Sequence, residues 1–411
     1  MKNFITYLKE VFKPSFQTSE DALLVTQKHN VDEDLDVLDT TIKEHNVNLE
    51  TLLAIYDELE VEIERVNLNE YRFEEIEFLE SFTYYDFIGE PSSVRVSFLY
   101  FLIVVAKDSP ESISHFDQLF ISDLFNSILG TNLDLTEKDI FNFYSFSKNK
   151  RVSNFHIPTK LLIKKIRDYG TQNTLSERLI SHIQKNILLN LYPITYESAT
   201  FEKANRIVTD YKYREEEIPF FLLPDYFGKK VNTILLTMDK TKAIAFSEIL
   251  QMISLDELDT VKKEEIQEVI KYIGIDAFIK ISNDILKVAA SFKPKLKMSV
   301  YWYEVDKKYS HTKNYFKMFH ENVVIVSGIL KMLNSYALIK EVPVCILETI
   351  LKRSYTLKKE LRLGKYSTDL GDLCLKILAS DYGEEGTNKL KEIYNETKYK
   401  RVRKKIDLIF E

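Results

Sequence analysis

Glycine and proline are scarce in this chain, with 10 glycines and 9 prolines among 411 residues. Sheet-rich folds depend on these residues for their turns, so their scarcity argues against a large all-β protein. Apolar residues instead recur at helical spacing in many segments joined by short connections. We therefore predict an all-α fold, a HEAT- or armadillo-like α-solenoid with irregular helical repeats.

The stretch Tyr366–Glu411 illustrates this pattern. Its spacing predicts three short amphipathic helices, over Thr368–Ser380, Thr387–Thr397 and Lys400–Phe410. None has an apolar stripe wide enough to fold alone, and such helices are stable only when they stack on neighbours. The rest of the chain repeats this organisation.

Cysteine is nearly absent, which excludes a disulfide framework. The two cysteines, Cys345 and Cys374, lie in apolar helical runs and have no metal-binding spacing, so both are predicted to be buried in a reducing compartment. The N-terminal stretch MKNFITYLKEVFK lacks the apolar run of a signal peptide. The longest apolar run, Phe98–Ala106, is far shorter than the ~20 residues that a membrane span needs. We expect a cytoplasmic protein without a membrane span.

Sequence motifs of catalysis are also missing. The chain contains no GxGxxG or GxxxxGK[ST] loop, no HExxH and no GxSxG elbow. The nearest approach to a metal site is His311 and His320, with Asp306 and Glu321 nearby, but a spacing of nine does not place both histidines on one helix face. Surface histidines with local hydrogen bonds are the simpler interpretation. The sequence predicts no catalytic residue, no cofactor and no metal, so we expect a protein that is not an enzyme.

Charge is present but unevenly distributed around a net value of -7. The stretch Val31–Glu80 holds 17 acidic and three basic residues, a net charge of -14, whereas Leu351–Glu411 holds 15 basic and 10 acidic residues, a net charge of +5. Solvated helix faces would account for both. A sharper interpretation is an acidic end that repels nucleic acid and a basic end that binds an acidic partner.

The chain is predicted to divide near residue 150. The polar, basic segment Ser147–Phe155 (SKNKRVSNF) has the composition of a linker between an acidic helical region, 1–150, and a helical-repeat region, 151–411, with a basic last repeat. In the first region, Thr136 and Asp139 have the spacing of a capping box for the helix that opens at Glu137. In the second, Pro294 is predicted to introduce a helix through Trp302.

Two further patterns have both a functional and a structural interpretation. The tract Met298–Lys317 mixes aromatic residues with lysines, a composition that binds single-stranded nucleic acid and occurs in helical-repeat DNA glycosylases. Its aromatic residues could equally pack in the core and rim of a repeat. The pairs Val94-Arg95 and Val402-Arg403 are typical of HEAT-like helices, in which valine faces the core and arginine reaches an acidic side chain.

The segment from His320 onward resembles part of a known family. It contains Gly328-Ile329-Leu330, the loop Leu363–Ser367 (LGKYS), the helix start Gly371–Cys374 (GDLC) and Lys398-Tyr399-Lys400. These motifs resemble the HEAT-like helical region of a large bacterial family whose members end in a domain of unknown function. Some members carry a WGR module, and one branch is linked by name to molybdate regulation. A tryptophan of the first motif is missing, and the third motif has two departures. The resemblance covers residues 320–411 and implies a helical scaffold without naming a reaction.

The leading candidate for a functional surface is a cluster of cations near the end of the sequence. Its members are Lys398, Lys400, Arg401, Arg403, Lys404 and Lys405. A structural alternative is a solubilising outer face on a terminal repeat. We expect a non-enzymatic, cytoplasmic bacterial scaffold that binds another protein. The alternative is a nucleic-acid-binding helical-repeat protein that uses this basic surface.

Overall fold

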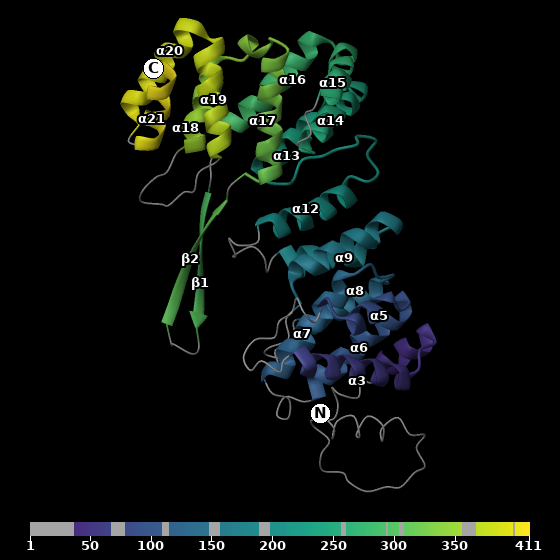
Figure 1. Ribbon diagram of the computed structural model, residues 1–411. Helices are drawn as coiled ribbons and strands as arrows, with labels where there is room; N and C mark the ends of the chain where they lie inside the picture. The colour runs from purple at the N-terminus through teal and green to yellow at the C-terminus, as the bar shows by residue number, and fades with distance from the viewer. Residues whose placement is uncertain are drawn as a thin grey trace, which may run out of the picture. The chain divides into compact units, whose positions relative to one another are not determined.

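The computed structural model describes most of the chain in eleven stretches. These are residues 37–66, 79–108, 115–147, 157–188, 198–255, 260–292, 295–303, 308–316, 318–355, 367–397 and 399–411. They are helical apart from one pair of strands, so the predicted all-α class is confirmed. The chain forms two compact units, Met1–Leu179 and Ile180–Glu411, whose elements are labelled in Figure 1. Of the predicted linker, Ser147–Phe155, residues 148–155 lie outside the described stretches.

The first unit is built from helices that follow a helical stretch at 37–45. They are α3 (Leu49–Val66), α5 (Phe82–Gly89), α6 (Ser92–Asp108), α7 (His115–Gly130), α8 (Glu137–Ser147), α9 (Thr159–Gln172) and the start of α10 (Glu177–His182).

Helix α6 is the core helix of the first unit. Every residue from Phe98 to Ala106 is buried. Phe98 and Phe101 stack on each other with ring centroids 5.7 Å apart, while Tyr56 of α3 meets Phe101 edge-on at 5.6 Å and Phe87 of α5 meets Phe98 at 5.0 Å. Aromatic pairs of this geometry add to the free energy gained from burial. The apolar run that the sequence singled out is thus the helix against which α3 and α5 pack.

The predicted capping box at the start of α8 is confirmed. The amide of Asp139 donates to Thr136 Oγ1 at 3.2 Å, and Asp139 Oδ2 accepts from the Thr136 amide at 2.8 Å and hydroxyl at 2.6 Å. Asp139 Oδ1 also accepts from the hydroxyl of Tyr100 on α6 at 2.7 Å. Burial and the neighbouring Asp139 carboxylate raise the pKa of Tyr100. One aspartate therefore both caps α8 and fixes it to the core helix.

The second unit follows from Ile180. Its helices are the π-helix η2 (Ile183–Leu188), α12 (Ser198–Lys212), α13 (Tyr226–Thr237), α14 (Lys240–Ser254), α15 (Thr260–Ile273), α16 (Ile275–Ser291), α17 (His320–Ser335), the 3₁₀ helix η4 (Ile339–Glu341), α18 (Val344–Tyr355), α19 (Thr368–Asp381), α20 (Gly383–Glu396) and α21 (Lys400–Phe410).

Consecutive helices of the second unit pack against each other. Contacts join α14 to α15, α15 to α16, α18 to α19 and α19 to α20. One buried apolar cluster runs from Ile218 to Ile406, with Phe246 of α14 and Phe278 of α16 fully buried 5.9 Å apart. The three helices predicted for Tyr366–Glu411 are confirmed, although α20 begins at Gly383 rather than at Thr387.

One element contradicts its prediction. Strands β1 (Lys295–Tyr303) and β2 (Lys308–Phe316) form an antiparallel pair, in which Met298 lies opposite Lys313 and Trp302 opposite Tyr309. The helix predicted from Pro294 through Trp302 is therefore wrong. The tract that mixes aromatic residues with lysines belongs to this hairpin rather than to a helical repeat.

Candidate functional site

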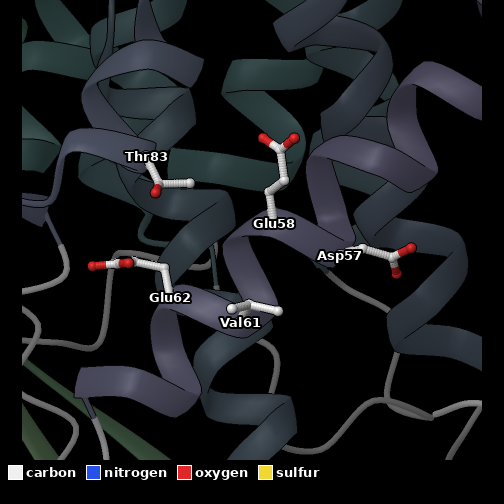
Figure 2. Close-up of a pocket in the computed structure, with 5 residues that line it drawn as sticks. All are labelled: Asp57, Glu58, Val61, Glu62 and Thr83. Carbon is white, nitrogen blue, oxygen red and sulfur yellow. The ribbon is translucent and has the colours of Figure 1, made fainter.

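A groove between α3 and α5 in the first unit is lined mainly by acidic side chains. It has a volume of about 370 Å³ and is lined by Asp57, Glu58, Val61 and Glu62 of α3 and by Thr83 of α5. Figure 2 shows the four α3 side chains projecting from neighbouring positions of the helix, with Thr83 beside them. Three of the five described residues that line the groove are acids and none of the five is a base, so this lining carries negative charge.

Helical spacing places these side chains at the surface. Leu52, Leu53, Tyr56 and Leu59 turn inward and are buried, since they recur at intervals of three and four residues. The positions between them consequently face solvent. Among them is Val61, whose exposed fraction is 66%. This exposed apolar side chain lies within the row of acids.

Helix α5, which contributes Thr83 to the groove, also has two exposed aromatic side chains. Its start is fixed by Ser81, whose hydroxyl accepts from the Tyr84 amide at 3.2 Å. Tyr84 and Phe87 face the core, which leaves Phe82 and Tyr85 exposed by 85% and 61%. Large exposed apolar side chains beside polar ones are typical of surfaces that bind another protein.

The structure places the predicted basic cluster mostly on α21, and not all of its members face solvent alike. Arg403 donates to the carbonyl of Tyr394 at 3.2 Å and lies 5.5 Å from the centroid of its ring. Arg95 donates to Thr131 Oγ1 at 2.9 Å, and among the described residues neither arginine hydrogen-bonds an acidic side chain, so the arginine–acid contact of the HEAT-like pairs stays a prediction. Lys398 lies outside the described residues.

Lys405 fixes α21 to the neighbouring helices. Its ammonium group forms an ion pair with Asp372 of α19, and the same carboxylate accepts a hydrogen bond from the Tyr355 hydroxyl of α18. Gly371 allows this approach, because a Cβ at this position would lie 2.6 Å from the Tyr355 ring. Two of the predicted binding residues, Arg403 and Lys405, thus hold the fold together.

The other three cations of α21 remain available to a partner. Lys400, Arg401 and Lys404 are exposed, and in the described part of the chain no salt bridge to them is found. Val402 and Ile406 are buried on the opposite side of the helix. The basic surface therefore consists of Lys400, Arg401 and Lys404.

A second cluster of charged groups joins α12, α13 and α17. Arg206 forms an ion pair with Glu321 and donates to the carbonyl of Phe221 at 2.7 Å. Glu202 accepts from the amides of His320 at 2.7 Å and Glu321 at 3.2 Å, which places an acid at the start of α17, where the helix dipole favours negative charge. Burial raises the pKa of Glu321, against the opposing effect of Arg206.

Asp225 completes this cluster. Its carboxylate accepts from the Gly228 amide at 2.7 Å, as the N-cap of α13, and from the Phe319 amide at 2.8 Å. Burial raises its pKa, against the effect of these amides. Perturbed carboxylates in a cluster can indicate an active site. Here Asp225, Glu202 and Glu321 already accept from helix amides or arginine, so we interpret the cluster as structural.

The described residues contain no cluster of metal ligands. No group of three or more histidine, cysteine, aspartate or glutamate side chains among them could bind a metal ion. His311 lies in β2 and His320 opens α17. Cys374 is fully buried, which raises the pKa of its thiol to about 12, whereas Cys345 is exposed, so its predicted burial is wrong. A thiol with so high a pKa is a poor nucleophile at neutral pH.

Comparison with models of known protein families, with curated proteins and with solved structures gives no match. Among the described residues, no individual helix has both the length and the apolar character to span a membrane; α5 and the Ser92–Ala106 part of α6 reach that threshold only together, as a pair bent by 116°. The groove and the basic surface are therefore interpreted from their own chemistry.

The sequence drew attention to α21 but not to the groove. The net charge of Val31–Glu80 was noted, yet Thr83, Phe82 and Tyr85 lie outside that stretch. The available signal was local, because α3 has Val61 off its apolar stripe and the short helix α5 (FTYYDFIG) has more large aromatic and aliphatic residues than one face can bury.

Proposed function

We propose that this chain is a non-enzymatic helical scaffold that binds a protein partner through the groove between α3 and α5. The observation that carries the proposal is the combination of Asp57, Glu58 and Glu62 with exposed Val61 on one surface. Exposed acids such as Asp57 and Glu58 attract a basic ligand, and the apolar side chain of Val61 adds contact area. The partner is a basic segment that also carries apolar side chains, such as an amphipathic helix.

The proposal includes a HEAT- or armadillo-like stack for the second unit. The packing of consecutive helices supports it, since contacts join α14 to α15, α15 to α16, α18 to α19 and α19 to α20. Repeats of this kind present long surfaces to other proteins. The family resemblance of residues 320–411, the bacterial origin and the cytoplasmic location stay predictions.

The nucleic-acid alternative rests on α21. Phosphate backbones are bound by several lysines and arginines at once. Arg403 and Lys405 are engaged within the fold, which leaves Lys400, Arg401 and Lys404 for a ligand. A surface of three cations beside Asp407 and Glu411 favours protein binding over nucleic-acid binding.

Reversal of the groove charge tests the proposed function. We expect the tagged wild-type chain to capture a protein from an extract of its native host, and the variant D57K/E58K to lose it, because like charges then face the basic segment. Asp57 and Glu58 are exposed, so the substitution leaves the core intact. The matched control is E264K/E265K on α15, which changes the net charge equally at two exposed acids that do not line the groove.

Quantitative mass spectrometry of the captured proteins gives the result. A partner that both variants retain, or that both lose, would contradict binding in the groove. Far-UV circular dichroism of each variant checks that the helices remain folded.

A further inference from the structure

We propose that the groove between α3 and α5 binds α21 of a second copy of the chain, so that copies associate through unlike surfaces. This inference rests on the proposed function, because it identifies one occupant for the same groove. The charges and the exposed apolar side chains of the two surfaces support it. Helix α21 would then be both part of the fold and a ligand.

The outward face of α21 has the chemistry that the groove requires. Lys400 and Lys404 lie one turn apart, and Leu408 follows after another turn. Leu408 is exposed by 62% and Phe410 is also exposed, although both are large apolar side chains. The buried face of the helix, with Val402 and Ile406, stays against its own unit. The exposed face thus combines cations with apolar residues, as an amphipathic ligand does.

The groove and α21 are complementary in charge and alike in exposed apolar residues. Asp57 and Glu58 of α3 would face Lys400, Arg401 and Lys404, while Val61 would contact Leu408, which lies on the same face of α21 as Lys400 and Lys404. Opposite charges steer the encounter and fix its register, and the apolar contacts slow dissociation. This contact would explain the uneven charge of the sequence, which is acidic near α3 and basic near α21.

The contact is heterologous, since the groove of one copy meets a different surface of the next. Each added copy leaves one groove and one α21 unoccupied, so association continues until a ring closes or grows as an open chain. Exposed charges are screened by salt, with a Debye length of about 10 Å at 0.1 M ionic strength and about 3 Å at 1 M. Association should therefore rise with protein concentration and weaken as salt is added.

Sedimentation velocity of the full chain, over a hundredfold range of concentration at low and high salt, tests the proposal. We expect wild type to associate at low salt. The variants D57K/E58K and K400E/K404E should each stay monomeric at concentrations about tenfold or more higher, because each presents like charges on both surfaces. An equimolar mixture of the two variants should associate again, since the reversed groove of one attracts the reversed helix of the other. E264K/E265K serves as the control that associates as wild type does.

Restoration in the mixture can arise only between copies. A wild-type chain that is monomeric at every concentration, a mixture that stays monomeric, or variants that associate as wild type would each overturn the proposal. Failure here is distinguishable from failure of the proposed function. If D57K/E58K loses a host protein while the wild-type chain remains monomeric, the groove binds a different protein.

Discussion

Replacement of Asp225 by alanine is expected to lower the free energy of unfolding of the second unit by about 2–4 kcal/mol. The carboxylate accepts from the amides of Gly228 and Phe319, which lie 91 residues apart in the sequence. Alanine removes both acceptors and leaves two amides inside the fold without a partner. Each unsatisfied buried donor costs about 1–3 kcal/mol.

Asp239 provides a matched control for this prediction. It caps α14 by accepting from the Lys242 amide at 3.1 Å, but it is exposed, and among the described residues no hydrogen bond joins its side chain to another element. We expect D239A to lower the free energy of unfolding by about 1 kcal/mol, the usual effect of removing an N-cap. D225N, which keeps one acceptor oxygen, should lie between the two alanine variants. Native-state hydrogen exchange on peptides of the second unit measures each change separately from the first unit. An equal decrease in the free energy of unfolding in D225A and D239A would show that the hydrogen bond from the Phe319 amide contributes nothing to stability.

Replacement of Gly386 by alanine is expected to destabilise the junction of α19 and α20 by about 1–3 kcal/mol. A Cβ at this position would lie 1.9 Å from the carbonyl oxygen of Leu378, a distance that real atoms do not reach. The neighbouring atom is backbone, so the corner between the helices has to open. Alanine favours helix over glycine by about 1 kcal/mol, but this gain does not offset a backbone collision.

Gly130 at the end of α7 is the control for Gly386. A Cβ there meets nothing within 4 Å, so G130A should leave stability unchanged or raise it by up to about 1 kcal/mol. Hydrogen exchange of peptides from α19 and α20 reports the local change. Protection in G386A equal to that of wild type would contradict the close packing of this corner. It would also weaken the account of how α21 is held, because α21 packs on α19 and α20.

Most helices could be predicted from local patterns. Helix α21 has the predicted bounds, Lys400–Phe410, and α8 begins at the predicted capping box. The residues that give each signal lie close together in the sequence, so a local pattern is enough to predict the helix. The start of α20 was missed by four residues, because Gly383 turns the chain with a φ of 54° and lets the helix begin early.

The hairpin β1–β2 was missed although its signal was present. In Lys295–Trp302 the residues Leu296, Met298, Val300 and Trp302 alternate with lysines and other residues, which is the period of a strand. Pro294 is also typical of a helix start, and the helix was predicted from this one residue rather than a strand from the alternation. Aromatic and β-branched residues in both halves of the tract also favour strands.

The clusters of the second unit could not be predicted from sequence at all. Glu202 caps α17 from 118 residues away, and Arg206 reaches Glu321 across 115 residues. Nothing local to either residue identifies the other, since such contacts form only when three helices pack together. The same holds for the division of the basic cluster, because Asp372 decides that Lys405 is structural while Lys404 stays exposed.

Site-specific photocross-linking in the native host tests the central claim that the groove between α3 and α5 is a protein-binding surface. A photoreactive amino acid would replace Val61, which lies in the groove, or Tyr272 of α15, which is similarly exposed at 69%. We predict a cross-linked protein adduct from position 61 that is absent from position 272. No adduct at position 61, or the same adducts at both positions, would contradict the claim.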